Sequence, residues 1–277
     1  MIKKAVKTGG NIYARLDKDG VFSFSEQLTY RLLASFFPFM LFLVAALSFL
    51  EVDKDTLITS MARNLPEQLY GFLRVFVEEI ANKRNVGALT IGLAFAAFAA
   101  SSGFNAFIQG VNRIYGESQQ RGFIKTLLLS LLLLLIFTLS IAIMFSSVVF
   151  IDSIFKLIFD RLPSAAIRTL TDITSFFLLV LTLSFMYMLA SQRKIRLRSA
   201  IPGSAAVVLF WAALTFGFNI YYKHFSKDPE IYGSLAGVIL LIGWLHMVSL
   251  SLLIGGELNS LTAKIAAKMI ERRRNMV

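Results

Sequence analysis

The sequence predicts an all-α integral membrane protein with six transmembrane helices and both termini in the cytoplasm. Of its 277 residues, 56% are hydrophobic and only 16% are charged, and the mean hydropathy is +0.68. A soluble domain carries nearer 25% charged residues. The apolar residues form long runs that reach the roughly 20 residues needed to cross a hydrocarbon core of about 30 Å. The basic residues stand in short segments between these runs, as the positive-inside rule requires.

The hydropathy pattern predicts spanning helices over residues 27–50, 87–112, 123–150, 168–190, 199–222 and 234–258, within a single membrane domain that covers residues 1–277. The third run is the clearest, because TLLLSLLLLLIFTLSIAIMFSSVVF contains no charged residue. Six spans place both termini on one side of the membrane. The loop QRKIRLRS (192–199) is basic and has no acidic residue, so we assign that side to the cytoplasm.

The first predicted outer segment, residues 51–86, has a pattern of its own. PEQLYGFLRVFVEEIANKR begins with Pro66 at a helix-start position and continues with apolar residues at helical spacing. This pattern predicts amphipathic helices that lie at the outer interface or cap the bundle. The alternative is a gate over an outward-facing cavity.

The net charge of +11 raises the question of a nucleic-acid partner. Proteins that bind nucleic acids gather Lys and Arg on one folded face, often beside stacking aromatic residues. Here the basic residues follow the membrane topology, so we expect no nucleic-acid partner. We expect the basic loops and a helical cytoplasmic tail, residues 259–277, to attract anionic lipid headgroups by about 1 kcal/mol per basic residue.

The residue types also limit the chemistry. The chain has no cysteine and two histidines, His224 and His246. Thiolate catalysis, cysteine-ligated zinc and a multi-histidine metal site are therefore excluded. We expect no metal and no cofactor.

The second predicted helix has two distinct faces. One is a stripe of small residues, Gly92, Ala96, Ala99, Gly103, Ala106 and Gly110, which allows close approach of another helix. The other carries Ser102, Asn105, Gln109 and Asn112. Amides in hydrocarbon need partners or water, so this helix belongs in the centre of the bundle. The amides are either interhelical hydrogen-bonding groups or the lining of a hydrated substrate path, and Arg113 after them can reach the lipid headgroups.

Further polar residues stand within or beside the other spans. Candidates for the same path are Asn219 in the fifth span, His246 and Glu257 in the sixth, and Asn259 just after it. Ionisable residues inside a membrane are functional candidates, although a neutral histidine can also bond a neighbouring helix. Gly255 and Gly256 before Glu257 allow either tight packing or a local break, and Arg31 and Arg113 are candidate partners for its carboxylate.

The first span contains Pro38, which bends a helix and provides either fixed architecture or a hinge. Glu26, Tyr30 and Arg31 stand at its cytoplasmic entry, where we predict that they line the mouth of the path.

Three stretches together resemble the YihY/BrkB family of bacterial inner-membrane proteins, formerly mislabelled ribonuclease BN. They are EQLTYRLLASFFPFMLFL (26–43), SSGFNAFIQGVNRIYG (101–116) and YGSLAGVILLIGWLHMVSLSLLIGGELNS (232–260). The residues that match the family pattern are Pro38, Asn112, Arg113, Tyr115, Gly233, Trp244, Gly256, Glu257 and Asn259. His246 departs from it, because the family usually has tyrosine there. A family-wide proton relay through this histidine is therefore in doubt.

The resemblance implies a multi-pass protein of the bacterial cytoplasmic membrane. Members have been labelled ribonuclease, virulence factor or transporter. Metal-dependent RNA cleavage needs clustered carboxylates or histidines, whereas the acidic residues here are scattered over segments on both sides of the membrane, so we expect no enzyme activity. The leading hypothesis is a transporter or flippase-like protein for an unknown, amphiphilic solute. The alternative is a non-transporting structural or scaffold protein of the cell envelope.

Overall fold

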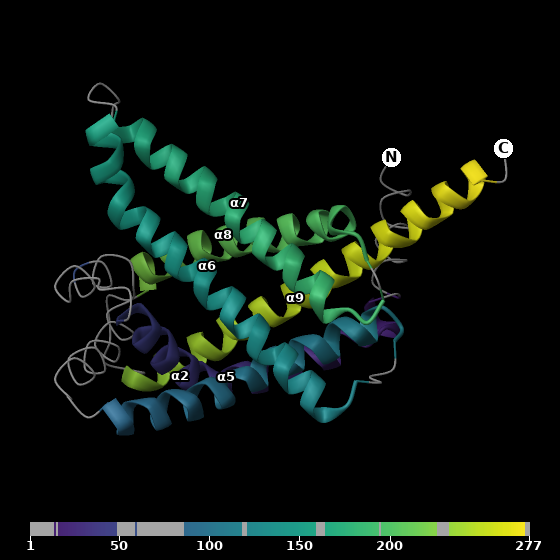
Figure 1. Cartoon of the computed structure of the whole chain (residues 1–277), viewed down its shortest axis with the longest axis horizontal. Coiled ribbons are helices and arrows are strands. Elements are labelled where there is room, and N and C mark those ends of the chain that lie inside the picture. The colour runs from purple at the N-terminus through teal and green to yellow at the C-terminus, as the bar shows by residue number, and fades with distance from the viewer. Residues whose placement is uncertain are drawn as a thin grey trace.

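The computed structural model describes residues 14, 16–48, 59, 86–117, 121–158, 164–193, 195–225 and 233–274. These residues form long α-helices and no strand (Figure 1). The helices are α2 (Val21–Ser48), α5 (Val86–Ile114), α6 (Phe123–Ile158), α7 (Ser164–Ala190), α8 (Leu197–Phe225) and α9 (Gly233–Arg274). The predicted all-α class is confirmed over this part of the chain. The predicted amphipathic segment 51–86 lies almost wholly outside the described residues.

Each predicted span falls on one of these helices, and most of the boundaries agree within a few residues. The helices α6 and α9 extend furthest beyond the predictions, to Ile158 and Arg274. Hydropathy defines where a membrane ends, whereas a helix continues into water as long as its residues favour it. The predicted tail, residues 259–277, accordingly begins as an unbroken continuation of α9 as far as Arg274.

Among the described residues, four helices contain a stretch that is long and apolar enough to cross a membrane. These stretches are Phe123–Met144, Thr169–Ala190, Leu197–Gly217 and Leu241–Lys264. Apolar side chains on α6 and α7, such as Leu128, Leu139 and Phe177, are exposed. That arrangement is typical of helices that face lipid. The topology with six spans and the orientation of the termini remain predictions.

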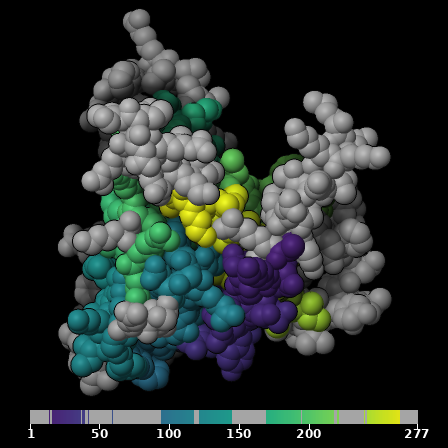
Figure 2. Space-filling view, turned by 90° about the vertical axis from the view of Figure 1, so that its right-hand side faces the viewer, coloured from purple at the N-terminus to yellow at the C-terminus, as the bar shows by residue number. Residues whose placement is uncertain are grey.

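The helices pack in chain order into a ring. Each of α2, α5, α6, α7, α8 and α9 contacts the next, and α9 returns to contact α2. Contacts of α5 with α7 and α9 cross the ring. The long α9 runs through the molecule and projects beyond it near the C-terminus (Figure 1). Figure 2 shows part of α9 in yellow between the green of α8 and the purple of α2.

The second half of α5 supplies much of the core, as the two-faced pattern predicted. Ala100, Ile108 and Val111 are buried, whereas Phe95 in the first half is 71% exposed. The small residues allow close packing. A Cβ added to Gly103 would lie 2.6 Å from the Ser35 hydroxyl of α2, and one added to Gly110 would lie 2.7 Å from Leu253 of α9. Glycine at these positions brings α5 close to both neighbours.

Candidate functional site

Polar side chains are buried together at the end of the bundle where α5 ends and α6 begins, which we call the α5–α6 end. The same end holds the loop from α7 to α8 and the second half of α9. The buried cluster there consists of Tyr115, Tyr187, Glu257, Asn259 and Ser260, all at most 5% exposed. Tyr115 follows α5, Tyr187 lies on α7, and the other three lie on α9.

Glycines bring the helices around the buried cluster into close contact. A Cβ on Gly203 of α8 would overlap the carbonyl oxygen of Gly255 on α9. A Cβ on Gly255 would in turn lie 2.9 Å from the Tyr187 hydroxyl. The sequence left two roles open for Gly255 and Gly256. The structure shows tight packing and an unbroken α9.

Side chains of α9 also bind the backbone of α8. The amide N–H of Gly203 donates a hydrogen bond to Asn259 Oδ1 at 2.7 Å, and the Thr262 hydroxyl donates to the Ser199 carbonyl oxygen at 2.8 Å. Pro202 lies between these positions and has no N–H to donate. The polar groups of Asn259 and Thr262 thus tie α8 and α9 together where α8 begins.

The two tyrosines of the cluster differ in their hydrogen bonding. Tyr187 is fully buried and its hydroxyl donates to the carbonyl oxygen of Leu252 on α9 at 2.5 Å. Tyr115 Oη has no hydrogen-bond partner among the described residues. Burial raises the pKa of Tyr115, and the nearby Glu257 carboxylate raises it further, while Arg193 acts in the opposite direction. Tyr115 therefore stays protonated at neutral pH and can act as a hydrogen-bond donor.

Two further polar atoms of the cluster, Asn259 Nδ2 and Ser260 Oγ, are buried without a hydrogen-bond partner in the described part of the chain. A buried donor without a partner costs about 1–3 kcal/mol, so such groups are uncommon unless something uses them. Together with the buried carboxyl group of Glu257, the cluster has the chemistry to hold the polar group of a solute or to exchange a proton with it.

Asn112, one of the predicted path residues, is buried and makes bonds that hold the backbone in place. Its amide nitrogen donates to the Ile108 carbonyl oxygen at 2.9 Å within α5. Its Oδ1 accepts a hydrogen bond from the Gln192 backbone N–H at 2.8 Å, which ties the end of α5 to the loop after α7. Glu257 and Asn259, two other predicted path residues, lie in the buried cluster.

The remaining predicted residues of α5 bond within their own helix. The Gln109 side chain donates to Asn105 Oδ1 at 3.0 Å, and the Ser102 hydroxyl donates to the Ala99 carbonyl oxygen at 2.7 Å. All three side chains are half-buried. Arg113 is exposed, and its guanidinium lies 4.5 Å from the centre of the Phe24 ring.

The other predicted residues lie on α2, α8 and α9. His246 Nδ1 lies 3.3 Å from the Thr29 hydroxyl, which joins α9 to α2. On α2, Glu26 and Tyr30 are exposed, Arg31 is half-buried, and Pro38 stands inside a continuous helix. Asn219 belongs to α8, but its side chain lies outside the described residues. These placements leave the predicted roles in a path, a mouth or a hinge untested.

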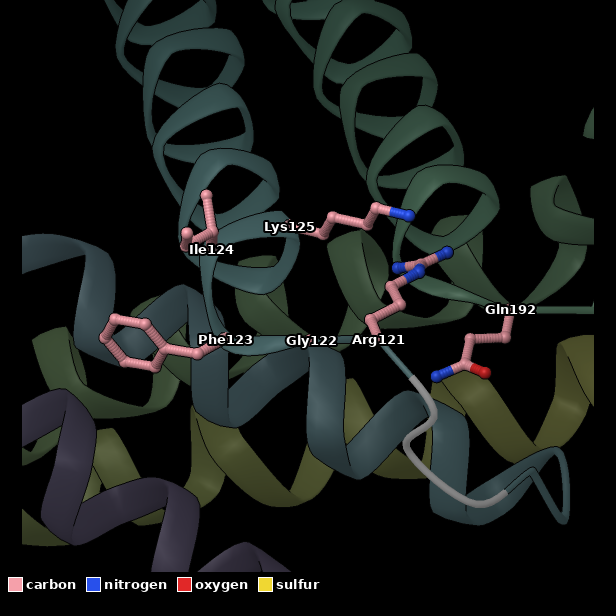
Figure 3. Close-up of a pocket in the computed structure, with 6 residues that line it drawn as sticks. All are labelled: Arg121, Gly122, Phe123, Ile124, Lys125 and Gln192. Atoms are coloured by element: carbon pink, nitrogen blue, oxygen red, sulfur yellow. The ribbon is translucent and has the colours of Figure 1, made fainter.

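Sequence reasoning did not single out Arg121, which binds the C-terminus of α7. Its guanidinium donates to the carbonyl oxygens of Ala190 and Ser191 at 3.1 Å, with longer bonds of 3.4 Å to Leu189. Burial lowers the pKa of this arginine. Beside it is a cavity of about 660 Å³ lined by Arg121, Gly122, Phe123, Ile124, Lys125 and Gln192 (Figure 3). In the sequence, Arg121 and Lys125 are recognisable only as two of the basic residues between predicted spans.

The sequence also gave no sign that Tyr187 belongs to the buried cluster. It is a single tyrosine in the apolar run FMYMLA, and nothing in that pattern shows that its hydroxyl reaches a carbonyl oxygen of α9.

Comparisons with known proteins agree with this membrane architecture. The family model described as "Virulence factor BrkB" matches residues 12–275. The ribonuclease-like protein YfkH of Bacillus subtilis (strain 168) is 28% identical over 250 residues, which cover 87% of this chain and 89% of that protein. A UPF0761 membrane protein of Vibrio atlanticus (strain LGP32) is 26% identical over 275 residues, covering 94% of this chain and 84% of the relative. No solved structure matches the chain.

Proposed function

The chain belongs to the Virulence factor BrkB family of membrane proteins, and on that premise we propose that it moves an amphiphilic, lipid-like solute across the bacterial cytoplasmic membrane. The buried cluster at the α5–α6 end is the part of the bundle that would receive the polar group of the solute. The apolar part would stay against the exposed aliphatic side chains of the helices.

The buried cluster is the observation that carries this proposal. Tyr115 Oη, Asn259 Nδ2 and Ser260 Oγ are buried donors without partners among the described residues, and Glu257, 3% exposed, lies within electrostatic reach of Tyr115. A helix bundle gains nothing in stability from burying such donors unsatisfied. Their burial without partners is explained if they bind a polar group during transport.

Reconstitution of the purified protein into liposomes tests the proposal. Fluorescently labelled phosphatidylglycerol and phosphatidylcholine serve as probes, and dithionite bleaches the labels exposed on the outer leaflet. We expect at least one probe to change leaflets faster in protein-containing vesicles than in protein-free vesicles. Rates no faster than in protein-free vesicles for both probes would contradict the proposal.

Polar and close-packed contacts between the helices favour the alternative, a structural or scaffold protein. Side-chain hydrogen bonds join α8 to α9 and α6 to α7, from Trp211 Nε1 to Ser251 Oγ at 2.8 Å and between Ser140 Oγ and Thr182 Oγ1 at 2.7 Å. These bonds stabilise one arrangement of the bundle. A protein that holds partners at the membrane would need such rigidity, and vesicles without any transport would support this alternative.

We further propose that the chain is not an enzyme, although one relative is named ribonuclease-like. The support is the scatter of acidic residues over the sequence, because metal-dependent RNA cleavage requires them in a cluster. Purified protein incubated with RNA and Mg²⁺ should leave the RNA intact, and cleavage that follows the protein through purification would overturn this proposal.

A further inference from the structure

The cavity beside Arg121 has the charge and position of a lipid headgroup site. Its six lining residues include the cations Arg121 and Lys125, the amide Gln192 and no acidic residue. In Figure 3, both cationic side chains extend toward the end of α7, whereas Phe123 points to the opposite side of α6. The cavity thus has a polar, basic side and an apolar side.

The hydrogen bonds of Arg121 fix the basic side in place without neutralising it. Its guanidinium donates to the carbonyl oxygens of Leu189, Ala190 and Ser191. Carbonyl oxygens at a helix C-terminus carry only partial negative charge, so these partners hold the side chain but leave most of its positive charge uncompensated. Lys125, one turn into α6, is exposed and adds a second charge.

The cavity also lies at the border of an apolar surface. The apolar stretch of α6 that is long enough to cross a membrane begins at Phe123, so a membrane crossed by this stretch would place its headgroups near the cavity. Exposed leucines continue from Lys125 along one face of α6 at steps of three and four residues, at Leu128, Leu132, Leu135 and Leu139. A lipid whose headgroup is in the cavity could lay an acyl chain along this leucine stripe.

From this arrangement we propose that the cavity binds the phosphate headgroup of an anionic phospholipid, with its acyl chains against the leucine stripe of α6. Basic pockets at the ends of transmembrane helices bind such headgroups by charge. Arg121 supplies positive charge, and the exposed ammonium group of Lys125 can donate to phosphate oxygens. The proposal does not depend on the function proposed above, because a bound lipid needs no transport.

Native mass spectrometry or an equivalent equilibrium binding measurement on the full chain in detergent tests this site. The probes are phosphatidylglycerol, phosphatidylcholine with the same acyl chains, and inorganic phosphate. We expect phosphatidylglycerol to bind at least tenfold more tightly than either of the others. Equal binding of phosphatidylcholine would overturn the role of charge, and equal binding of inorganic phosphate would overturn the role of the acyl chains.

Matched variants locate the site. Lys125→Gln should weaken phosphatidylglycerol binding about fivefold, as expected for loss of one basic residue near the membrane surface. Lys264→Gln removes the same charge from an exposed position on α9 that does not line the cavity, and should change binding less than twofold. An equal loss in both variants would mean general surface attraction and would overturn the assignment. Both lysines are exposed, so neither change disturbs packing.

Discussion

The two tyrosines of the buried cluster illustrate how similar residues take different roles. Tyr187 donates to a carbonyl oxygen of α9 and packs against the Phe107 ring, with 5.3 Å between ring centres. Its hydroxyl joins two helices. The Tyr115 hydroxyl is buried without such a partner among the described residues. We therefore assign a structural role to Tyr187, and we propose a role in solute binding for Tyr115.

This difference predicts opposite effects on stability. Tyr187→Phe removes a buried hydrogen bond and should destabilise the protein by about 1 kcal/mol, lowering Tm by roughly 2 °C. Tyr115→Phe removes a buried hydroxyl with no partner, so Tm should stay the same or rise. Thermal unfolding in detergent, followed by circular dichroism, measures both. A larger loss for Tyr115→Phe than for Tyr187→Phe would show that its hydroxyl has a stabilising partner.

At the scale of single residues, the sequence indicates which residues are unusual in an apolar chain. It does not indicate which residues they contact. It indicated that Asn112, Glu257 and Asn259 are unusual in an apolar chain, and all three are buried at one end of the bundle. It could not indicate that Asn112 accepts a bond from Gln192, because that contact joins positions 80 residues apart. It also gave no reason to separate Arg121 from the other loop cations.

At the scale of helices, the close packing of α8 on α9 depends on glycine. The backbone of Gly203 is so near Gly255 that a side chain at position 203 would meet the carbonyl oxygen of Gly255 and the Asn259 amide group. Since backbone cannot move aside as a flexible side chain can, the two helices must separate to accept a methyl group. That separation would also break the bond from Gly203 to Asn259.

A pair of glycine variants on α8 tests this packing. Gly203→Ala should destabilise the protein by about 3 kcal/mol, at the upper end of the usual cost of overpacking. Gly217→Ala, on the same helix with nothing within 4 Å of the added Cβ, should be neutral or stabilising by up to about 1 kcal/mol through helix propensity. The two variants are compared by size-exclusion chromatography in detergent, which measures the fraction of each protein that stays folded. Equal tolerance of both changes would contradict the close contact.

The helices themselves were largely predictable from hydropathy. Apolar runs of membrane length and charged segments between them placed α2, α5, α6, α7, α8 and α9. The predicted stripe of small residues on α5 also matches its contacts at Gly103 and Gly110. The pairing of helices was not predictable, since small residues indicate that a neighbour comes close but not which neighbour. Likewise, hydropathy did not reveal how far α6 and α9 continue past the predicted spans.

At the scale of the whole molecule, the ring of helices gathers basic residues at the α5–α6 end, among them Arg113, Arg121, Arg193, Arg196 and Arg198. The positive-inside rule assigns this end to the cytoplasm. With six spans, the N- and C-termini would lie on that side as well. The orientation is a prediction from charge, because the helix ring alone has no preferred direction in a membrane.

Labelling of single cysteines tests the orientation cleanly, because the chain has no cysteine of its own. Arg196→Cys in the loop before α8 should react with a membrane-impermeant thiol reagent in inverted vesicles and not in intact cells. Asp228→Cys, in a segment predicted to lie outside, should show the reverse pattern. Labelling of Arg196→Cys from outside intact cells would contradict the assignment of both termini to the cytoplasm.

The central claim is that the buried cluster takes part in moving a lipid-like solute. The most direct test is the rate at which labelled phosphatidylglycerol changes leaflets in vesicles containing wild type, Glu257→Gln or Glu117→Gln protein. Glu257 is buried in the cluster, whereas Glu117 is a half-buried carboxylate just after α5 at the same end. We predict a rate at least tenfold lower for Glu257→Gln and an unchanged rate for Glu117→Gln. A Glu257→Gln protein that is folded and as fast as wild type would contradict the claim.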